Sequence, residues 1–539
     1  MLVTSAGWNF ADVFERIADG IPEALAQQQG GRRFSWAEFD HRADGVAAAL
    51  LSAGLFEQDK VAQYLFNSPE YLESQYGCWK AGMATVNTNY RYAADELVYL
   101  WDNADVAAVV FHGSFSAQID VVRDRVPGVT LWLWVDDRSG QCPPWAQPYE
   151  AAATSKPGRT QGPWGRSGDH LILLYTGGTT GVPKGVMWRQ DDVFGALDAN
   201  NRKRMPPEQD LVAIGERITQ PGPRGMPGAP LMHGTGFFNA VSTLMVGGSI
   251  TTMPGRNFDP IELLDTIERE HINSISIVGD AFAKPILAAL DAEPDRWDIS
   301  SLRVIVSSGV MWSKETKQGL SRHNPRLIMV DALGSSEAIG MATNISTSES
   351  GDDTAKFELG PNGRVLNVDG DDVVPGSGEL GRVALRGFTP IGYYKDPDKS
   401  AATFEVIDGV RYAIPGDWAE VLADGSVKLL GRGSQCINTG GEKVYPEEVE
   451  ECLKLHPSIA DAAVVGLPDE RFGEAITALV ELAPGSTLDE QTVIDFVKTK
   501  LARYKAPKRV FEIDSIGRAV NGKLDYRSLK REAATRAAD

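Results

Sequence analysis

Apolar positions in the first third of the chain alternate between helical spacing and short continuous runs. Ser35-Trp36-Ala37-Glu38 is a capping box, and the apolar residues behind it recur at helical spacing, which predicts a helix from about residue 35 to 53. The next predicted elements are a strand at 61–65, helices around 70–81 and 94–102, and a strand at 106–111. This alternation favours a mainly parallel α/β sheet.

The same pattern continues to the end of the chain. It predicts strands at 171–175, 304–308, 327–330, 462–465, 477–481 and 510–513 and a helix at about 489–501. The segment from Pro206 to Pro230 is rich in proline and glycine, so we expect an irregular loop there. At 539 residues the chain is longer than one core usually supports, and at least two domains are expected.

A loop with unusual chemistry follows the predicted strand at 171–175. It contains Thr176, Gly177, Gly178, Thr179, Thr180 and Gly181, and then Lys184 between Pro183 and Gly185. Glycines let backbone N–H groups approach an anion, hydroxyls add donors, and a lysine adds a point charge, so this loop suits a polyphosphate. It is not a Walker loop, because proline instead of glycine precedes the lysine and glycine instead of Ser or Thr follows it.

Two later strands end in small polar residues. The strand at 304–308 runs into Ser308 and Gly309, and the strand at 327–330 runs into Asp331-Ala332-Leu333-Gly334-Ser335-Ser336-Glu337. Because α/β folds bind ligands outside the carboxyl ends of their strands, these two ends are candidates for a binding crevice.

Charge and composition limit the partners. The formal net charge of −20 argues against nucleic acid as a partner, and it means that anionic ligands must be held by local donors and metal ions. No run of 18 apolar residues and no secretion signal is recognised, so we expect no membrane span. The four cysteines lack paired metal spacing, which favours reduced thiols and a cytoplasmic location.

These motifs, in this order, resemble those of the adenylate-forming superfamily of acyl-CoA synthetases, adenylation domains and luciferases. The segments that carry the resemblance are TGGTTGVPKG, GSSE, GVRYAIPGD, GRGSQCINTGGEK and GKLDYR, and they look most like fatty-acyl-CoA ligases, in particular the subgroup that acts on steroid side-chain acids. The resemblance implies an α/β fold with a large N-terminal domain of parallel-rich sheets packed with helices, plus a small mobile α+β C-terminal domain.

The resemblance also implies roles for residues of the large domain. Thr176 to Thr180 and Lys184 would bind the phosphates of ATP, and the backbone from Asp331 to Ser335 would flank adenine. Ser336 would touch the α-phosphate, and Glu337 would bind Mg²⁺. Asp417 and Arg432 would bind the ribose. Leu333 stands where an aromatic residue usually stacks on adenine, and Pro415 stands where a threonine usually precedes the Gly-Asp pair.

His233 lies in Met232-His233-Gly234-Thr235-Gly236. A lone histidine among small and aromatic residues is more often part of the core, and the resemblance places it instead beside the carboxylate end of the acid. Both interpretations stay open at this point.

The last part of the chain is expected to be mobile. Residues 1–431 would form the large domain, 432–434 the hinge and 435–539 the small domain, with Ser434 at a hinge position that is typically Asp or Lys. By resemblance, Gly440 and Gly441 would line the channel for CoA, and Lys523 would stabilise charge on the reacting phosphate. Gly433 could absorb the dihedral change that hinge motion requires.

Together these features predict ATP-dependent ligation of a carboxylic acid to CoA through an acyl-adenylate, with ATP, Mg²⁺ and CoA taking part. Thr180, Glu337, His233 and Lys523 are the candidates for catalysis. Transfer to a carrier-protein thiol, a luciferase-like oxygenase and a non-catalytic nucleotide-binding protein are the alternatives. The sequence leaves the acid and the oligomeric state open, with a homodimer among the choices.

Overall fold

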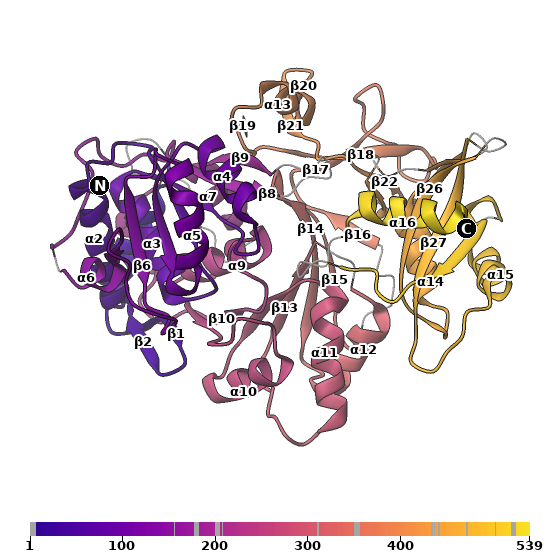
Figure 1. Ribbon diagram of the computed structural model, residues 1–539, viewed down its shortest axis with the longest axis horizontal. Helices are drawn as coiled ribbons and strands as arrows, with labels where there is room; N and C mark the ends of the chain where they lie inside the picture. The colour runs from indigo at the N-terminus through magenta and orange to yellow at the C-terminus, as the bar shows by residue number, and fades with distance from the viewer. Residues whose placement is uncertain are drawn as a thin grey trace. The chain divides into compact units, whose positions relative to one another are not determined.

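The computed structural model divides the chain into two compact units, and each is described by itself. The described residues are 7–155, 157–176, 183–199, 205–206, 209–309, 312–349, 356–432, 435, 437–439, 442–469, 473–501, 503–518 and 524–538. The first unit contains residues 1–354 and 386–413, and the second contains 355–385 and 414–539. Figure 1 labels many of the elements of both.

The first sheet of the first unit carries the predicted phosphate loop. Its strands lie in the order β19 (Gly392–Tyr393), β9 (Lys184–Arg189), β8 (Leu171–Thr176), β4 (Ala84–Asn87), β3 (Lys60–Tyr64), β5 (Val106–His112), β6 (Leu131–Val135) and β7 (Gln147–Pro148). The pairs from β8 to β7 are parallel, whereas β8–β9 and β9–β19 are antiparallel. The expectation of a mainly parallel α/β sheet is confirmed here.

The second sheet of this unit carries the two strand ends that were expected to form a crevice. Its order is β2 (Arg32–Ser35), β1 (Leu25–Gln29), β11 (Ser249–Thr252), β10 (Arg224–Pro227), β12 (Ser274–Ile277), β13 (Val304–Ser308), β14 (Ile328–Ser335) and β15 (Ala338–Ser346). All pairs from β1 to β14 are parallel, and the pairs β1–β2 and β14–β15 are antiparallel.

Helices flank these sheets. They are α1 (Phe10–Gly20), α2 (Trp36–Ser52), α3 (Pro69–Ala81), α4 (Ala94–Asn103), α5 (Ser116–Val122), α6 (Tyr149–Ala153), α7 (Gln190–Asp198), α8 (Leu211–Arg217), α9 (Gly234–Met245), α10 (Pro260–Glu270), α11 (Gly279–Ala292), α12 (Lys314–His323) and α13 (Pro397–Thr403), with a hairpin of β20 (Phe404–Ile407) and β21 (Val410–Ala413). The capping box of α2 has both of its reciprocal bonds, between Ser35 and Glu38. None of the helices in the described residues combines the length and apolar character that a membrane crossing requires.

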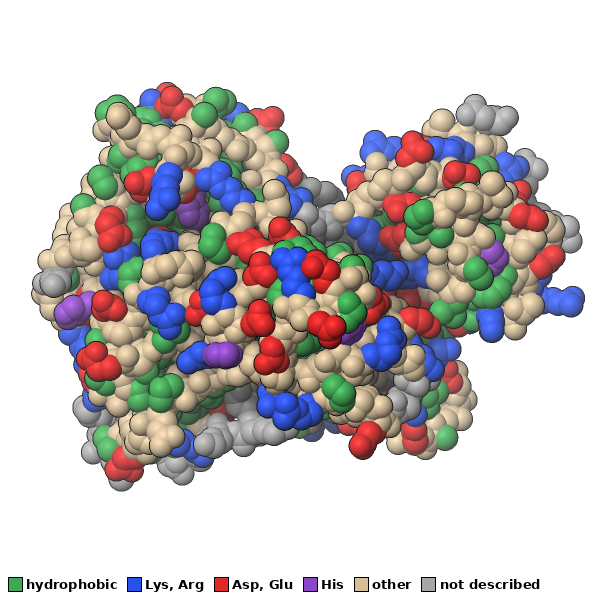
Figure 2. Space-filling view, turned by 90° about the horizontal axis from the view of Figure 1, so that it is seen from below, with side chains coloured by type: hydrophobic (Ala, Val, Ile, Leu, Met, Phe, Trp, Pro, Cys, Tyr) green, Lys and Arg blue, Asp and Glu red, His purple; other side chains and the backbone are tan. Residues whose placement is uncertain are grey.

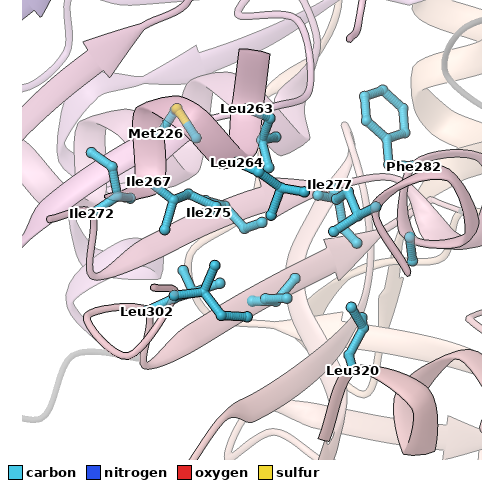
Figure 3. Packing of buried hydrophobic residues seen from close by; sticks show 14 of the residues in the cluster. Met226, Leu263, Leu264, Ile267, Ile272, Ile275, Ile277, Phe282, Leu302 and Leu320 are labelled. Carbon is cyan, nitrogen blue, oxygen red and sulfur yellow. The ribbon is translucent and has the colours of Figure 1, made fainter. Parts of the chain in front are cut away.

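A core of aliphatic side chains holds the second sheet against helices α10, α11 and α12. Figure 3 shows Leu263, Leu264 and Ile267 of α10 packed near Ile275 and Ile277 of β12. Trp297, Trp312 and Met329 belong to the same buried cluster. Burial of this size fixes the β13 and β14 strand ends, since each large aliphatic side chain contributes roughly 1.5–3 kcal/mol.

The segment from Pro206 to Pro230 contains regular structure, so the expectation of an irregular loop was wrong. Asp210 caps α8 by accepting hydrogen bonds from the backbone N–H groups of Val212 and Ala213, and Leu211 and Ile214 are buried. Strand β10 lies between β11 and β12. The prolines at 221 and 223 precede this strand, and Pro227 ends it, so they mark boundaries and do not break the element.

The second unit holds two sets of strands. One contains β16 (Lys356–Leu359), β17 (Gly363–Leu366), β18 (Leu380–Arg386), β22 (Asp417–Val421) and β23 (Val427–Arg432). The other contains β24 (Ile437–Thr439), β25 (Glu442–Val444), β26 (Ile459–Asp469), β27 (Gly473–Leu482) and β28 (Arg509–Glu512), with α14 (Pro446–Lys454), α15 (Glu490–Lys500) and α16 (Tyr526–Ala538). The small α+β part expected near the C-terminus is confirmed, and a hinge at 432–434 stays a prediction.

Candidate active site

The predicted phosphate loop connects two antiparallel strands. Thr176 ends β8 and is the register partner of Lys184, which begins β9. Gly177, Gly178, Thr179, Thr180 and Gly181 lie outside the described residues. Because the loop runs into a strand and not into a helix, no helix N-terminus follows it directly, and the Lys184 ammonium is the charge that the described end of the loop offers to an anion.

Lys184 lies beside a carboxylate and an aromatic ring. Its Nζ donates to Oδ2 of Asp396 at 2.8 Å and lies 5.9 Å from the ring centroid of Tyr393. The hydrogen bond from Lys184 holds the pKa of the Asp396 carboxyl below its usual range. Asp396 and Tyr393 belong to the segment Gly392-Tyr393-Tyr394-Lys395-Asp396-Pro397.

Glu337 occupies the turn of the β14–β15 hairpin. Its Oε1 accepts a hydrogen bond from the hydroxyl of Tyr393 at 2.8 Å, and its backbone N–H donates to Oγ of Ser335 at 3.2 Å. The indole Nε1 of Trp188 donates to the backbone oxygen of Ser336 at 2.8 Å. Trp188 is fully buried on β9, so the strand after the phosphate loop positions the Ser336–Glu337 turn.

The two predicted strand ends lie side by side. Ser307 pairs with Asp331 and Ser308 pairs with Ala332 in the parallel β13–β14 ladder. The strand continues through Leu333, Gly334 and Ser335, which is longer than the sequence predicted, and Gly309 follows β13 with φ +94°. The two strand ends expected to form a crevice are therefore adjacent in the sheet, and the crevice itself stays a prediction.

Asp331 has a buried partner that the sequence did not indicate. Nζ of Lys317, on α12, contacts Oδ2 of Asp331, and both side chains are nearly inaccessible to solvent. Lys317 also contacts Asn344 and Ser346 of β15. The segment predicted to flank adenine is thus anchored at its first residue by an ion pair inside the fold.

His233 is the N-cap residue of α9 and is partly exposed. Its backbone oxygen accepts from Phe237 and its backbone N–H donates to Pro230. A Cβ at Gly236 would lie 2.4 Å from the backbone oxygen of Pro230, so glycine is needed for this close approach. The partly exposed side chain is compatible with a place beside the acid, which stays a prediction.

Asn87 connects the phosphate loop to the His233 segment. This buried side chain at the end of β4 accepts from the backbone N–H of Tyr175 at 2.5 Å and donates to the backbone oxygens of Tyr175 at 2.9 Å and Met232 at 2.7 Å. Tyr175 lies two residues before Gly177, and Met232 directly precedes His233. Sequence reasoning missed Asn87, and only its place at the end of an apolar run could have drawn attention to it.

Within the second unit, Asp417 and Arg432 are brought together. They are register partners in the antiparallel β22–β23 ladder, and Asp417 is buried. Gly416 has φ +106°, a conformation that favours glycine and that delivers Asp417 at the start of its strand. Gly433, Ser434, Gly440, Gly441 and Lys523 lie outside the described residues, so the structure does not test their roles.

The donor set fits Mg²⁺. That ion usually keeps several waters and is held by one or two carboxylates together with substrate phosphates. Glu337 offers one carboxylate in a partly buried turn, and the described residues contain no cluster of three His, Cys, Asp or Glu that would form a protein-only cage. When bound with ATP, the ion would neutralise charge on the phosphates beside Glu337.

Charged side chains on the surface are mixed. The face drawn in Figure 2 shows Asp and Glu interspersed with Lys and Arg. The overall field of a chain with net charge −20 does not attract an anionic ligand, and the binding of such a ligand by local groups such as Lys184 stays a prediction.

Comparison with known proteins gives full-length matches. The chain is 38% identical over 542 residues to a medium/long-chain-fatty-acid–CoA/3-oxocholest-4-en-26-oate–CoA ligase of Mycolicibacterium smegmatis, covering 98% of this chain and 97% of that protein. It is 38% identical over 546 residues to a 3-oxocholest-4-en-26-oate–CoA ligase of Rhodococcus rhodochrous, with the same coverage of 98% and 97%. An anthranilate CoA ligase solved with anthranoyl-AMP has the same fold, with a TM-score of 0.83, 22% identity and coverage of 99% and 98%.

Two family models divide the chain between them. The model described as "AMP-binding enzyme C-terminal domain" matches residues 448–523, and the model described as "AMP-binding enzyme" matches residues 14–394. The second of these ranges contains the phosphate loop, His233, the Ser308–Gly309 strand end, Glu337 and Tyr393. With most of its length matched in this way, the chain belongs to the AMP-binding enzyme family.

Proposed function

We propose that this protein is an AMP-forming acid–CoA ligase, which couples a carboxylic acid to CoA through an acyl-adenylate and releases AMP and pyrophosphate. The observation that carries the proposal is the arrangement around Tyr393. Lys184, the proposed cation for phosphate, lies over the ring of Tyr393. Glu337, the proposed carboxylate for Mg²⁺, accepts a hydrogen bond from the hydroxyl of Tyr393. Full-length identity of 38% to acid–CoA ligases supports the same reaction.

The first half-reaction places charge on the α-phosphate. The acid's carboxylate oxygen attacks the α-phosphorus of ATP, the bond from that phosphorus to the bridging oxygen breaks, and pyrophosphate leaves with the electron pair. Lys184 and the hydroxyl of Ser336 would stabilise this charge by position and electrostatics. We assign the same task to Thr180 and Lys523. Asp417 and Arg432 would hold the ribose.

The second half-reaction needs a thiol at the acyl carbon. The thiolate sulfur of CoA attacks that carbon, the carbon–oxygen bond to AMP breaks, and AMP leaves. We propose that rotation at residues 432–434 withdraws Lys523 and presents Gly440 and Gly441 to CoA. The protein's contribution to this step is to move Lys523 away from the nucleotide and to bring Gly440 and Gly441 to CoA.

A medium- or long-chain fatty acid or a steroid side-chain acid is the proposed substrate, because relatives of 38% identity are named for these acids. We place the acid beside His233, whose side chain is partly exposed. The described cysteines, Cys78, Cys142 and Cys452, are free thiols, which supports a reducing compartment such as the cytoplasm.

Pyrophosphate release across a panel of carboxylic acids, with and without CoA, tests the proposal. Release that depends on a fatty or steroid acid, with acyl-CoA formed only when CoA is present, is the expected result. Acyl transfer to a carrier protein but not to CoA would support the carrier-protein alternative. ATP binding with no pyrophosphate release for any acid would support a non-catalytic nucleotide-binding protein, and oxygen uptake would support an oxygenase.

A further inference from the structure

The lysine of the predicted phosphate loop is already paired with a carboxylate of the protein. Nζ of Lys184 lies 2.8 Å from Oδ2 of Asp396, and the exposed fractions of the two side chains are 22% and 32%. The two residues are 212 positions apart in the sequence, so the pair is a product of the fold. A phosphate that reaches Lys184 therefore meets a negative charge beside it.

Asp396 is held in place by its own segment. It is the N-cap of α13, where its Oδ1 accepts from the backbone N–H of Lys399 at 3.0 Å and Pro397 occupies the first helical position. The backbone oxygen of Asp396 accepts from Oγ of Ser400 at 2.6 Å. Oδ1 serves the helix while Oδ2 serves Lys184, so the carboxylate is fixed by both of its oxygens.

The neighbouring residues fasten this segment to the strand that carries Lys184. The backbone N–H of Tyr394 donates to the oxygen of Gly185 at 2.8 Å, and β19 pairs with β9. The hydroxyl of Tyr394 and Nζ of Lys395 both donate to the carboxylate of Asp105, each at 2.7 Å. Asp396 is consequently more restricted than a loose surface side chain would be.

We propose that Asp396 is the internal counter-ion of Lys184 and sets how tightly the site holds polyphosphate. The inference rests on the proposed role of Lys184 in binding the phosphates of ATP. An anion that contacts Lys184 either displaces the carboxylate or lies beside it, and both outcomes weaken binding. The effect of Asp396 is to weaken the retention of pyrophosphate after the first half-reaction.

The test is titration of the full chain with inorganic pyrophosphate by calorimetry, at low and fixed ionic strength and without acid or CoA. Asp396→Asn keeps a good helix cap and removes the charge, so it should lower the dissociation constant of pyrophosphate about three- to tenfold. Asp396→Ser, another neutral cap, should give the same change. Both variants should also be inhibited by pyrophosphate at lower concentrations than the native chain.

Asp259→Asn is the matched control. Asp259 also caps a helix, α10, by accepting from the backbone N–H of Ile261 at 2.8 Å, and a proline also follows it. The variant removes the same charge elsewhere in the same unit and should leave pyrophosphate binding unchanged. In a Lys184→Met background, Asp396→Asn should change the logarithm of the pyrophosphate dissociation constant by at most half as much as it does in the native chain.

Equal pyrophosphate affinity in Asp396→Asn, Asp396→Ser and the native chain would overturn the inference. An equal gain in pyrophosphate affinity in Asp259→Asn would also overturn the inference, because the effect would then come from net charge and not from the position of Asp396. These results leave the proposed function untouched, since acyl-CoA formation by the native chain is measured separately. Conversely, a native chain that ligates no acid but shows the predicted pyrophosphate affinities would contradict the proposed function alone.

Discussion

The hydroxyl of Tyr393 donates a hydrogen bond to Oε1 of Glu337 at 2.8 Å, although 56 residues separate the two in the sequence. Tyr393 is almost completely buried, and its bond to the partly exposed Glu337 is part-buried. A hydrogen bond to a charged carboxylate is worth roughly 1.5–3 kcal/mol when it is removed. The contact therefore orients the carboxylate proposed to meet Mg²⁺ before any nucleotide arrives.

Replacing Tyr393 with Phe should raise the Mg²⁺ concentration needed for half-maximal pyrophosphate release and lower its maximal rate by about tenfold, because Glu337 loses its orienting donor. A titration of Mg²⁺ at saturating ATP and acid measures both quantities. Tyr394→Phe is the control, since the hydroxyl of Tyr394 bonds to Asp105 instead. An unchanged Mg²⁺ requirement in Tyr393→Phe would contradict the positioning role.

The two proposed half-reactions should separate in variants of the second unit. Lys523→Ala should slow acyl-adenylate formation by roughly 10²- to 10³-fold, as the loss of one well-placed donor does, and should retain thiol transfer from a supplied adenylate. Gly441→Trp should retain adenylate formation and lose transfer to CoA. Single-turnover measurements of each step distinguish these cases, and equal loss of both steps in both variants would argue against the rotating scheme.

Lys80 is expected to be a major determinant of stability. Its ammonium is fully buried and lies 2.7 Å from Glu15, 2.8 Å from Asp40 and 2.8 Å from Asp44. Lys80→Met would remove the cation that these carboxylates share, although Arg166 still pairs with Glu15 and Arg159 with Asp40. It should lower the free energy of unfolding by roughly 3–5 kcal/mol. Urea denaturation measures the change. Lys284→Met removes an exposed lysine paired with Asp280 at 3.5 Å, and it should have little effect.

Stability of the second unit should depend on pH through Glu450. Burial raises the pKa of this carboxyl from 4.5 to about 8, and the hydroxyl of Tyr526 and the backbone N–H of Val464 donate to it. Between these two pKa values the folded state holds a proton that the unfolded state has lost, so the stabilising contribution of the proton decreases as pH rises through that window. At lower pH both states are protonated.

Glu450→Gln should therefore raise the melting temperature at pH 8 relative to the native chain, and the advantage should shrink as the pH is lowered to 5. Differential scanning calorimetry at several pH values measures this difference. The exposed Glu512 provides the control substitution, Glu512→Gln, which should follow the native profile. A difference between Glu450→Gln and the native chain that stays constant with pH would contradict the assignment.

Much of the local structure could be predicted because the signals lie close together in sequence. The Ser35–Glu38 capping box needs four consecutive residues, and both bonds are present. The strand before the phosphate loop and the strand end at Ser308 follow from short apolar runs. The segment at 206–230 was misjudged because α8 and β10 are short and each contains a glycine, Gly215 and Gly225.

The contacts that assemble the candidate site could not be predicted in this way. Lys184 and Asp396, and Tyr393 and Glu337, meet through pairing of β19 with β9 and through the β14–β15 hairpin. No periodicity in the sequence specifies which strand a two-residue strand such as β19 will join. Asp396-Pro397 predicts a helix cap on its own, but nothing local predicts the lysine that the cap also binds.

The amide of Asn87 has a practical consequence for building hybrid enzymes. One side chain joins the strand before the phosphate loop to the residue before His233, so the segments proposed to hold the acid and ATP are hydrogen-bonded to the same amide. A chimera that imports a new acid-binding region from a relative must import a segment around Met232 that still accepts this amide. Otherwise the grafted segment would lose its hydrogen bond to Asn87 and its orientation relative to the strand before the phosphate loop.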